Sequence, residues 1–186
     1  MRKTRAGVIG IGHLGYHHVR NYLALGDVDF VGAVDIDADR RATVAEELKI
    51  RTFESVEALI DEGVDVIFGV GGKTGNGGLA AAKERGVWGV GVDVDQYFTL
   101  PNEKDILITS CMKRLDNAVF AVTEAQVGGE FPGGALYVGT LENGGVGLAP
   151  YHDFEGEIPA ELTAEVEAIL AGIIDGSIST GWPPAE

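Results

Sequence analysis

Three glycines between residues 8 and 15, in the sequence Val-Ile-Gly-Ile-Gly-His-Leu-Gly, constrain the fold of this chain more than any other feature. An apolar run ends at the first glycine, and apolar residues with helical spacing follow the last one, which predicts a strand, a tight turn and a helix. Gly10 permits the turn, Gly12 has no side chain to keep a phosphate away from the backbone, and Gly15 lets the helix lie close to the strand. Because a helix N-terminus presents unpaired N–H groups, this segment can hold a pyrophosphate.

An acidic residue stands where such a turn needs one. A second apolar run, residues 30–34, ends in Asp35, about 20 residues after Gly15. A carboxylate at that place can accept hydrogen bonds from both hydroxyls of an adenine ribose. The alternative interpretation, a glycine-rich turn that binds no ligand, stays open.

The remaining sequence continues the alternation of strands and helices. Apolar runs predict strands at residues 49–53, 64–70, 88–92 and 106–110, with helices between them, and the run at 64–70 suggests a strand covered on both faces. Two glycine-weakened segments, 133–139 and 144–150, predict a hairpin or edge pair, and the final helix begins at Pro159. Together these predict one α/β domain over residues 1–186, with a doubly wound, mostly parallel, Rossmann-like sheet, helices on both faces and a C-terminal edge hairpin.

Composition excludes several classes of partner. The 186 residues carry a formal net charge of −15, so nucleic acid and an anionic membrane are not expected partners. No signal peptide or transmembrane run is apparent, which favours a cytoplasmic protein, as after recombinant expression. The single cysteine, Cys111, has apolar neighbours and is expected to be a packed thiol. His13, His17 and His18 lie within one helical turn, but no third ligand accompanies them and no metal site is predicted.

Charge is distributed unevenly along the chain. Residues 1–60 hold 8 basic and 9 acidic side chains, whereas residues 61–186 hold 6 basic and 20 acidic ones. One face of the sheet could simply be acidic. The sharper interpretation is that segments of different origin meet near residue 60.

The first segment, residues 1 to about 60, resembles the NAD-binding domain of the Gfo/Idh/MocA oxidoreductases. The resemblance rests on the three glycines, His18, the strand end that carries Asp35, and residues 53–59. It implies that the segment from Gly10 to Gly15, with His13 and Leu14, holds the pyrophosphate, and that Asp35 holds the adenosine ribose and favours NAD over NADP. Arg40 and Arg41 could weaken that preference or be plain surface charges.

The second segment, from about residue 63 onward, resembles the C-terminal lobe of basic-membrane-lipoprotein receptors, the purine-nucleoside type of ABC-transporter substrate-binding protein. It carries the matching stretches 64–68, 71–77, 91–97, 113–114 and 144–151. The resemblance implies a nucleoside-like ligand held by the Gly71 loop, by Asp93 through ribose hydroxyls, and by Lys113. Gly71 and Asp93 could also complete a dinucleotide site. The first lobe and the lipid-bearing cysteine of that family have no counterpart here.

Neither family's machinery is complete. At the fourth and fifth strands the oxidoreductases carry a Thr-Pro turn and a Glu-Lys-Pro, where this chain has Gly-Gly-Lys-Thr and Asp-Val-Asp. Without a placed acid or base, hydride transfer loses about 10²- to 10⁴-fold. We therefore interpret the chain as an engineered chimera without evolved catalytic activity that could retain weak nucleotide binding. Three alternatives remain: an NAD(H)-binding module, a nucleoside-binding half-site, and an NAD-dependent oxidoreductase. We expect no catalytic residue, a small-molecule partner, and a monomer or weak homodimer.

Overall fold

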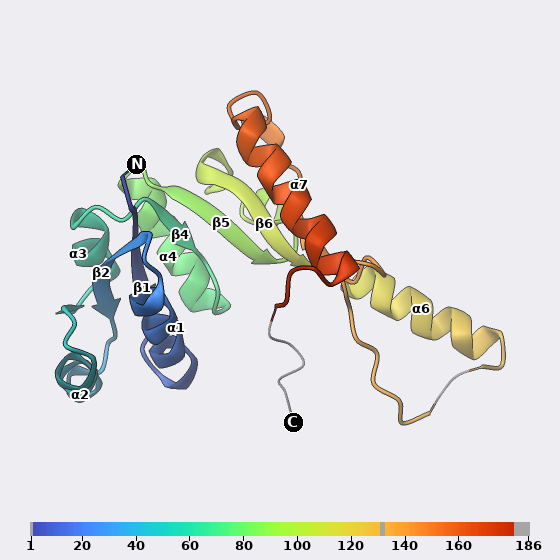
Figure 1. Ribbon diagram of the computed structural model, residues 1–186, viewed down its shortest axis with the longest axis horizontal. Helices are drawn as coiled ribbons and strands as arrows, with labels where there is room; N and C mark the ends of the chain where they lie inside the picture. The colour runs from blue at the N-terminus through green and yellow to red at the C-terminus, as the bar shows by residue number, and fades with distance from the viewer. Residues whose placement is uncertain (1, 131–132, 181–186) are drawn as a thin grey trace. The chain divides into compact units, whose positions relative to one another are not determined.

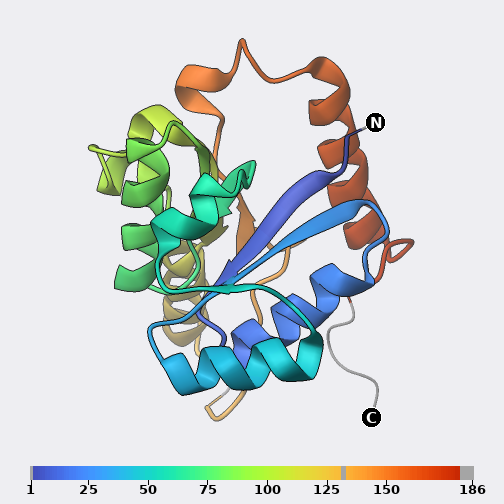
Figure 2. The same ribbon diagram turned by 90° about the vertical axis from the view of Figure 1, so that its left-hand side faces the viewer.

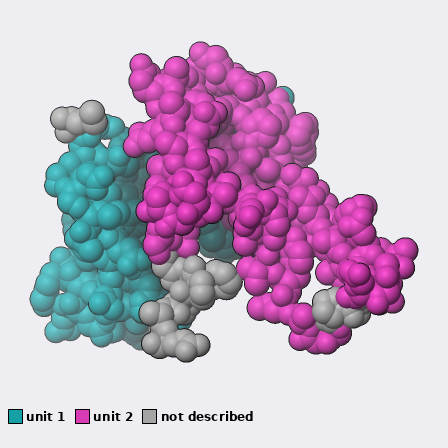
Figure 3. All heavy atoms as spheres, turned by 45° about the vertical axis from the view of Figure 1, so that its right-hand side comes forward, with its two compact units in different colours: residues 1–90, 102–107 teal, residues 91–101, 108–186 magenta. Residues whose placement is uncertain are grey.

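The computed structural model describes residues 2–130 and 133–180, and these form two compact units (Figure 3). The first unit holds residues 1–90 and 102–107, and the second holds residues 91–101 and 108–186. The boundary falls inside one strand, β5 (Trp88–Asp93), and not near residue 60. Because β5 is continuous through the boundary, the two units share one strand. The single domain predicted from the sequence therefore stays a prediction.

The first unit alternates strands and helices as predicted (Figures 1 and 2). Its elements are β1 (Thr4–Ile9), α1 (His13–Ala24), β2 (Val28–Val34), α2 (Ala38–Leu48), β3 (Thr52–Phe53), α3 (Val56–Asp61), β4 (Val66–Phe68), α4 (Lys73–Glu84), the start of β5 and the 3-10 turn η1 (Lys104–Ile106). Strands β1, β2 and β3 pair in parallel in that order, and β4 pairs in parallel with β5. This is the mixed α/β architecture with parallel sheets that the sequence predicts.

Helices cover both faces of the first sheet. Val8 of β1 clusters with Val19 of α1 and Val44 of α2, all of them buried. The neighbouring residue Gly7 points to the opposite face, where a Cβ would lie 2.7 Å from a methyl group of Leu59 on α3. The alternation of side chains along β1 therefore places α1 and α2 on one face and α3 on the other.

Side-chain caps fix the starts of α2 and α3. The Asp37 carboxylate accepts hydrogen bonds from the N–H groups of Asp39 (2.9 Å) and Arg40 (3.0 Å). The Ser55 hydroxyl accepts from the N–H of Ala58 (3.1 Å). Each side chain satisfies a donor that the first turn of a helix leaves unpaired.

One continuous sheet was expected, but the strands form two sheets that divide between β1 and β4. The N–H of Asp65 donates to the carbonyl of Arg5 (3.2 Å), as in a ladder. The N–H of Arg5, however, donates to the Asp65 carboxylate (2.9 Å) and not to a backbone carbonyl. Beyond these two contacts, β1 and β4 line a cavity of ≈ 310 Å³ and do not pair. The Asp65 side chain thus takes the N–H that would continue the backbone pairing, which ends after one bond.

The interpretation of β4 as covered on both faces is also wrong. Its residues alternate exposed, buried and exposed: Val66 is 37% and Phe68 is 49% exposed, while Ile67 is buried. An unbroken apolar run lacks the alternation of apolar and polar residues that marks a half-covered strand. It therefore cannot show which faces of the strand are covered.

The second unit contains the end of β5, α5 (Gln96–Thr99), β6 (Leu107–Lys113) from its second residue on, α6 (Leu115–Val127), β7 (Val146–Leu148), the 3-10 turn η2 (His152–Phe154) and α7 (Ala160–Asp175). β7 pairs antiparallel with β6, with Met112 opposite Gly147. The predicted pairing of 144–150 with 133–139 is therefore corrected, since residues 133–139 contain no strand. Glycines at 133, 134 and 139 weaken that segment, and β6 offers a longer edge.

The last helix has the predicted ends. Pro159 immediately precedes α7, and Gly176 follows it in the left-handed conformation (φ 80°), as at many helix C-termini.

Buried apolar side chains are concentrated in the first unit. Within the described part of the second unit, the buried hydrophobic residues are Ala149 and Phe154. No residue of α6 is buried, and Phe120 is 68% exposed. No helix within residues 2–130 and 133–180 is long and apolar enough to cross a membrane.

Replacement of Gly15 by alanine should destabilise the protein. The added Cβ would lie 1.8 Å from the carbonyl oxygen of Gly10, a backbone atom that cannot rotate away. We expect the free energy of unfolding, measured with urea, to fall by about 1–3 kcal/mol. Gly77→Ala is the matched control, because Gly77 lies inside α4 with nothing within 4 Å of its ideal Cβ. That control should raise stability by about 0.5–1 kcal/mol, and two equal effects would contradict the packing argument.

Asp65 should make stability depend on pH. The Arg5 N–H, with help from the nearby Arg2, lowers the pKa of the Asp65 carboxyl below its usual value. A lowered folded-state pKa contributes stability above the unfolded value of about 4, and this contribution is lost as the pH falls through the folded value. Between about pH 5 and pH 3, the urea midpoint of the wild type should therefore fall further than that of Asp65→Asn. Asp27→Asn is the control, because Asp27 lies in an exposed turn. Its urea midpoint should fall as much as that of the wild type.

Candidate functional site

The turn between β1 and α1 has the geometry that its glycines predict. Gly10 has φ +82°, and its N–H donates to the carbonyl of Val34 at the end of β2 (2.7 Å). Gly15 lies so close to Gly10 that a Cβ on Gly15 would overlap the Gly10 carbonyl oxygen, as described above. Gly12 precedes α1, has no side-chain cap, and has open space where a Cβ would point. The turn therefore leaves room for a group to approach the first N–H donors of α1.

Asp35 lies beside this turn, as predicted, and also holds it in place. One carboxylate oxygen accepts from the N–H of Ile11 (2.9 Å) and the other from the N–H of Asp37 (3.0 Å). Because a carboxylate has about four lone-pair sites, both oxygens can accept further hydrogen bonds. Asp35 is thus placed to bind hydroxyl groups and to fix the loop that would hold the phosphates.

Two arginines that the sequence left ambiguous are structural parts of this site. Nε of Arg40 donates to the carbonyl of Ile11 (2.7 Å), and its guanidinium lies 5.5 Å from the centre of the Tyr16 ring. Arg41 donates to the carbonyl of Asp35 (2.7 Å). Arg40 and Arg41 lie about one helical turn after the Asp37 cap, so their side chains point back toward the end of β2. This position is the sequence signal that could have identified them as part of the site.

The histidines form a small aromatic cluster. The rings of His13 and His17 lie 5.1 Å apart, edge to face, and Tyr16 contacts His17 in the same way. Among the described residues, no group of three or more His, Cys, Asp or Glu side chains could hold a metal ion.

The turn between β4 and α4, in the same unit, repeats this design. Gly71 (φ +135°) and Gly72 (φ +57°) both have positive φ angles, which glycine adopts readily. A Cβ on Gly75 would lie 2.0 Å from the carbonyl oxygen of Gly69, as one on Gly15 would from Gly10. The Gly71 loop is therefore a second place where a helix N-terminus meets a strand end without intervening side chains.

Asp93 and Lys113, predicted from separate strands, come together in the second unit. Oδ1 of Asp93 lies 2.7 Å from Nζ of Lys113, and both side chains are more than half exposed. Asp93 has φ +68°, which is rare for a residue other than glycine. Strained residues of this kind concentrate at binding sites, so Asp93 is a candidate to bind a ligand.

A neighbouring cluster was missed from the sequence. Nε2 of His152 lies 2.8 Å from Oδ2 of Asp95, and the His152 ring stacks on Tyr97 at 4.1 Å. The Tyr97 hydroxyl donates to Asp153 (3.0 Å). Asp95 also accepts from the N–H of Tyr97 and so caps the start of α5. Nothing in the sequence around His152 marks it, because its partners lie more than fifty residues earlier.

Cys111 lies half-buried in β6, as expected of a packed thiol, and burial raises its pKa. The predicted site residues thus form two groups. Gly10, Gly12, His13, Leu14, Gly15, Asp35 and Gly71 lie in the first unit, and Asp93 and Lys113 lie in the second.

Parallel strands that end in glycine-rich turns, each followed by a helix, define a class of α/β proteins that bind small molecules at strand ends. Residues 52–177 match the family model described as "ABC transporter substrate-binding protein PnrA-like", and the chain belongs to that family. Residues 4–84 match the model described as "Oxidoreductase family, NAD-binding Rossmann fold". The two-part resemblance is therefore confirmed, and the two matches overlap over residues 52–84.

Several curated relatives are similar to parts of the chain. A CD4+ T-cell-stimulating antigen of Listeria monocytogenes is 36% identical over 140 residues, 68% of this chain and 38% of its own length. UDP-N-acetylglucosamine 3-dehydrogenase of Acidithiobacillus ferrooxidans is 38% identical over 115 residues, 61% of this chain and 35% of its own. The nucleoside-binding protein BmpA of an ABC transporter in Lactococcus lactis is 27% identical over 160 residues, 78% of this chain and 44% of its own length.

The chain spans less than half the length of these relatives. Among solved structures, a transcriptional activator of the comK gene from Bacillus halodurans has a TM-score of 0.62 at 19% identity, with 100% of this chain and 60% of the other covered. At that identity the similarity shows the fold.

Arg40→Ala should loosen the β1–α1 turn. It removes the hydrogen bond to the Ile11 carbonyl, worth about 1 kcal/mol, and therefore should speed hydrogen exchange of the Ile11 amide about fivefold. Exchange can be followed residue by residue by NMR. Arg20→Ala, on an exposed position of α1, should leave that amide unchanged. An unchanged Ile11 amide in Arg40→Ala would show that the arginine does not hold the turn.

Proposed function

We propose that this chain is an engineered fusion of the two families whose retained function is weak binding of an adenine dinucleotide, NAD(H), at the β1–α1 turn. The observation that carries the proposal is the Asp35 carboxylate, which is hydrogen-bonded to Ile11 inside the glycine-rich turn. That contact fixes a ribose-binding acceptor beside the N–H donors that would receive the pyrophosphate.

Three further features support this proposal. Gly12 leaves space over the turn, so a pyrophosphate can reach the backbone. Residues 4–84 match an NAD-binding family model, and the similar dehydrogenase of A. ferrooxidans shares 38% identity. Arg40 keeps the Ile11 carbonyl engaged and adds a positive charge at the turn.

We propose that hydride transfer is not part of this function. Catalysis needs a proton donor or acceptor within hydrogen-bond reach of the reacting carbon's substituent. The strand ends of β4 and β5 carry Gly-Gly-Lys-Thr and Asp-Val-Asp, and neither resembles the oxidoreductase pattern. Lys113, a possible substitute from the second unit, is held in an ion pair with Asp93.

A second candidate function, nucleoside binding, rests on Asp93. Its positive φ and its 2.7 Å ion pair with Lys113 place a carboxylate and an ammonium group at strand ends of the segment that matches the PnrA-like family. A carboxylate accepts from a pair of ribose hydroxyls, and an ammonium donates to a base or hydroxyl oxygen. The similar L. lactis protein is described as nucleoside-binding.

Titration with NADH tests the first proposal. We expect enhanced nicotinamide fluorescence, with a Kd tighter than about 1 mM, and competition by ADP-ribose. Asp35→Asn keeps one oxygen for the Ile11 N–H but loses a ribose acceptor, and it should weaken binding about tenfold. Asp37→Asn is the matched control: it makes the same chemical change two residues away, and asparagine caps helices as well as aspartate does.

The outcomes separate the two candidates. Equal NADH signals from the wild type and Asp35→Asn would exclude the β1–α1 site. Adenosine binding that Asp93→Asn abolishes, and that Asp35→Asn leaves intact, would instead establish the nucleoside half-site. NADH oxidation by UDP-N-acetyl-3-ketoglucosamine would contradict the absence of catalysis.

A further inference from the structure

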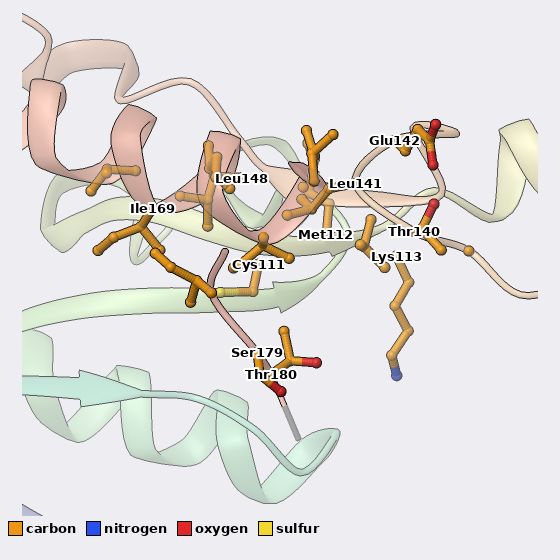
Figure 4. Close-up of a pocket in the computed structure, with 18 of the residues that line it drawn as sticks. Cys111, Met112, Lys113, Thr140, Leu141, Glu142, Leu148, Ile169, Ser179 and Thr180 are labelled. Atoms are coloured by element: carbon orange, nitrogen blue, oxygen red, sulfur yellow. The ribbon is translucent and has the colours of Figure 1, made fainter. Parts of the chain in front are cut away.

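A cavity of ≈ 960 Å³ lies within the second unit, between α7 and the strands β6 and β7 (Figure 4). The proposed dinucleotide site does not use it. Pockets of about 300–1,000 Å³ with mostly apolar walls and a few polar groups are typical small-molecule sites. The cavity therefore has the size and the character of a binding pocket.

Apolar side chains form most of its wall. Ile169 and Ile173 of α7 face Cys111 and Met112 of β6 and Leu148 of β7 across the cavity. Ile169 is 43% and Leu148 is 36% exposed, although both lie on the faces that α7 and the sheet turn toward each other. The helix and the strands thus leave an apolar space between them that their own side chains do not fill.

The charged groups of the wall lie at one end. Figure 4 shows Lys113, Thr140 and Glu142 on one side of the cavity and Ile169 toward the other, while Ser179 and Thr180 lie apart from them, below Cys111 in this view. The charge of Lys113 is matched by Asp93 at 2.7 Å. Lys113, Asp93 and Glu142 therefore sum to one negative charge, so this end offers hydrogen-bonding groups without attraction for an anion.

We propose that this cavity binds a neutral amphiphile, a molecule with one alkyl chain and an uncharged, hydroxylated head. The chain lies against α7 and β6, and the head meets Thr140 and Glu142. A carboxylate head would be repelled by Glu142 and by a protein of net charge −15. The same net charge disfavours a second copy of the chain as the occupant, because two such chains repel each other.

Cys111 provides a direct reporter of occupancy. It is the single cysteine of the chain and lines the cavity. A bound alkyl chain would cover its thiol and slow its reaction with the neutral reagent N-ethylmaleimide. This readout locates a ligand at the cavity, which a binding isotherm alone does not do.

The test uses monodecanoylglycerol below its critical micelle concentration, with the full chain. We expect saturable binding by calorimetry, protection of Cys111 from N-ethylmaleimide, and binding of decanoate at least about tenfold weaker. Ile169→Trp narrows the cavity and should weaken binding about tenfold. The matched control is Leu162→Trp, because Leu162 lies on the same helix with 45% exposure but does not line the cavity.

Four results would overturn the proposal. No saturable binding would do so, as would equal weakening by Ile169→Trp and Leu162→Trp in proteins with unchanged circular dichroism. Binding of decanoate as tight as that of monodecanoylglycerol would refute the neutral head. A dimer in light scattering that Ile169→Trp dissociates would show that a second copy fills the cavity. None of these outcomes depends on whether NADH binds.

Discussion

The close approach of helix to strand at two glycine pairs is the constraint on which the first unit depends. At Gly15 and again at Gly75, a helix lies against a carbonyl oxygen so closely that even a Cβ would not fit. This contact sets the helix N-terminus directly above the strand end, where the N–H groups point outward. The buried cluster of Val8, Val19 and Val44 then holds α1 and α2 on the same face of the sheet. The geometry of these turns and the packing of the core have the same origin.

The junction between the two family matches is also where the regular sheet stops. The two matches overlap over residues 52–84, which span β3, α3, β4 and α4. Between β1 and β4 the pairing ends after one backbone bond, and the Asp65 carboxylate takes the next donor. Shared strand-helix units explain why one segment matches both family models. The incomplete ladder indicates that a common supersecondary frame does not by itself supply matching strand edges.

Local chemistry made much of the first unit predictable. Glycine spacing, the Asp37 and Ser55 caps and the run ending at Asp35 each act within a few residues, so the sequence displays them directly. The division of the sheet, the exposure of Val66 and the pairing of β7 with β6 depend on distant partners, which one sequence does not reveal. The same reason hid the Asp95–His152 pair. Asp93 and Lys113 were predicted as separate residues of a family motif, and only the structure shows their ion pair.

The sparse core of the second unit has a consequence for how the molecule comes apart. With Ala149 and Phe154 as its described buried apolar residues and none on α6, this unit has little hydrophobic free energy to resist local opening. The first unit, with its clustered valines, resists far more. Proteolytic cleavage should therefore begin in the second unit while Trp88, which lies in the first, still reports a native environment. A single melting midpoint would then describe neither unit.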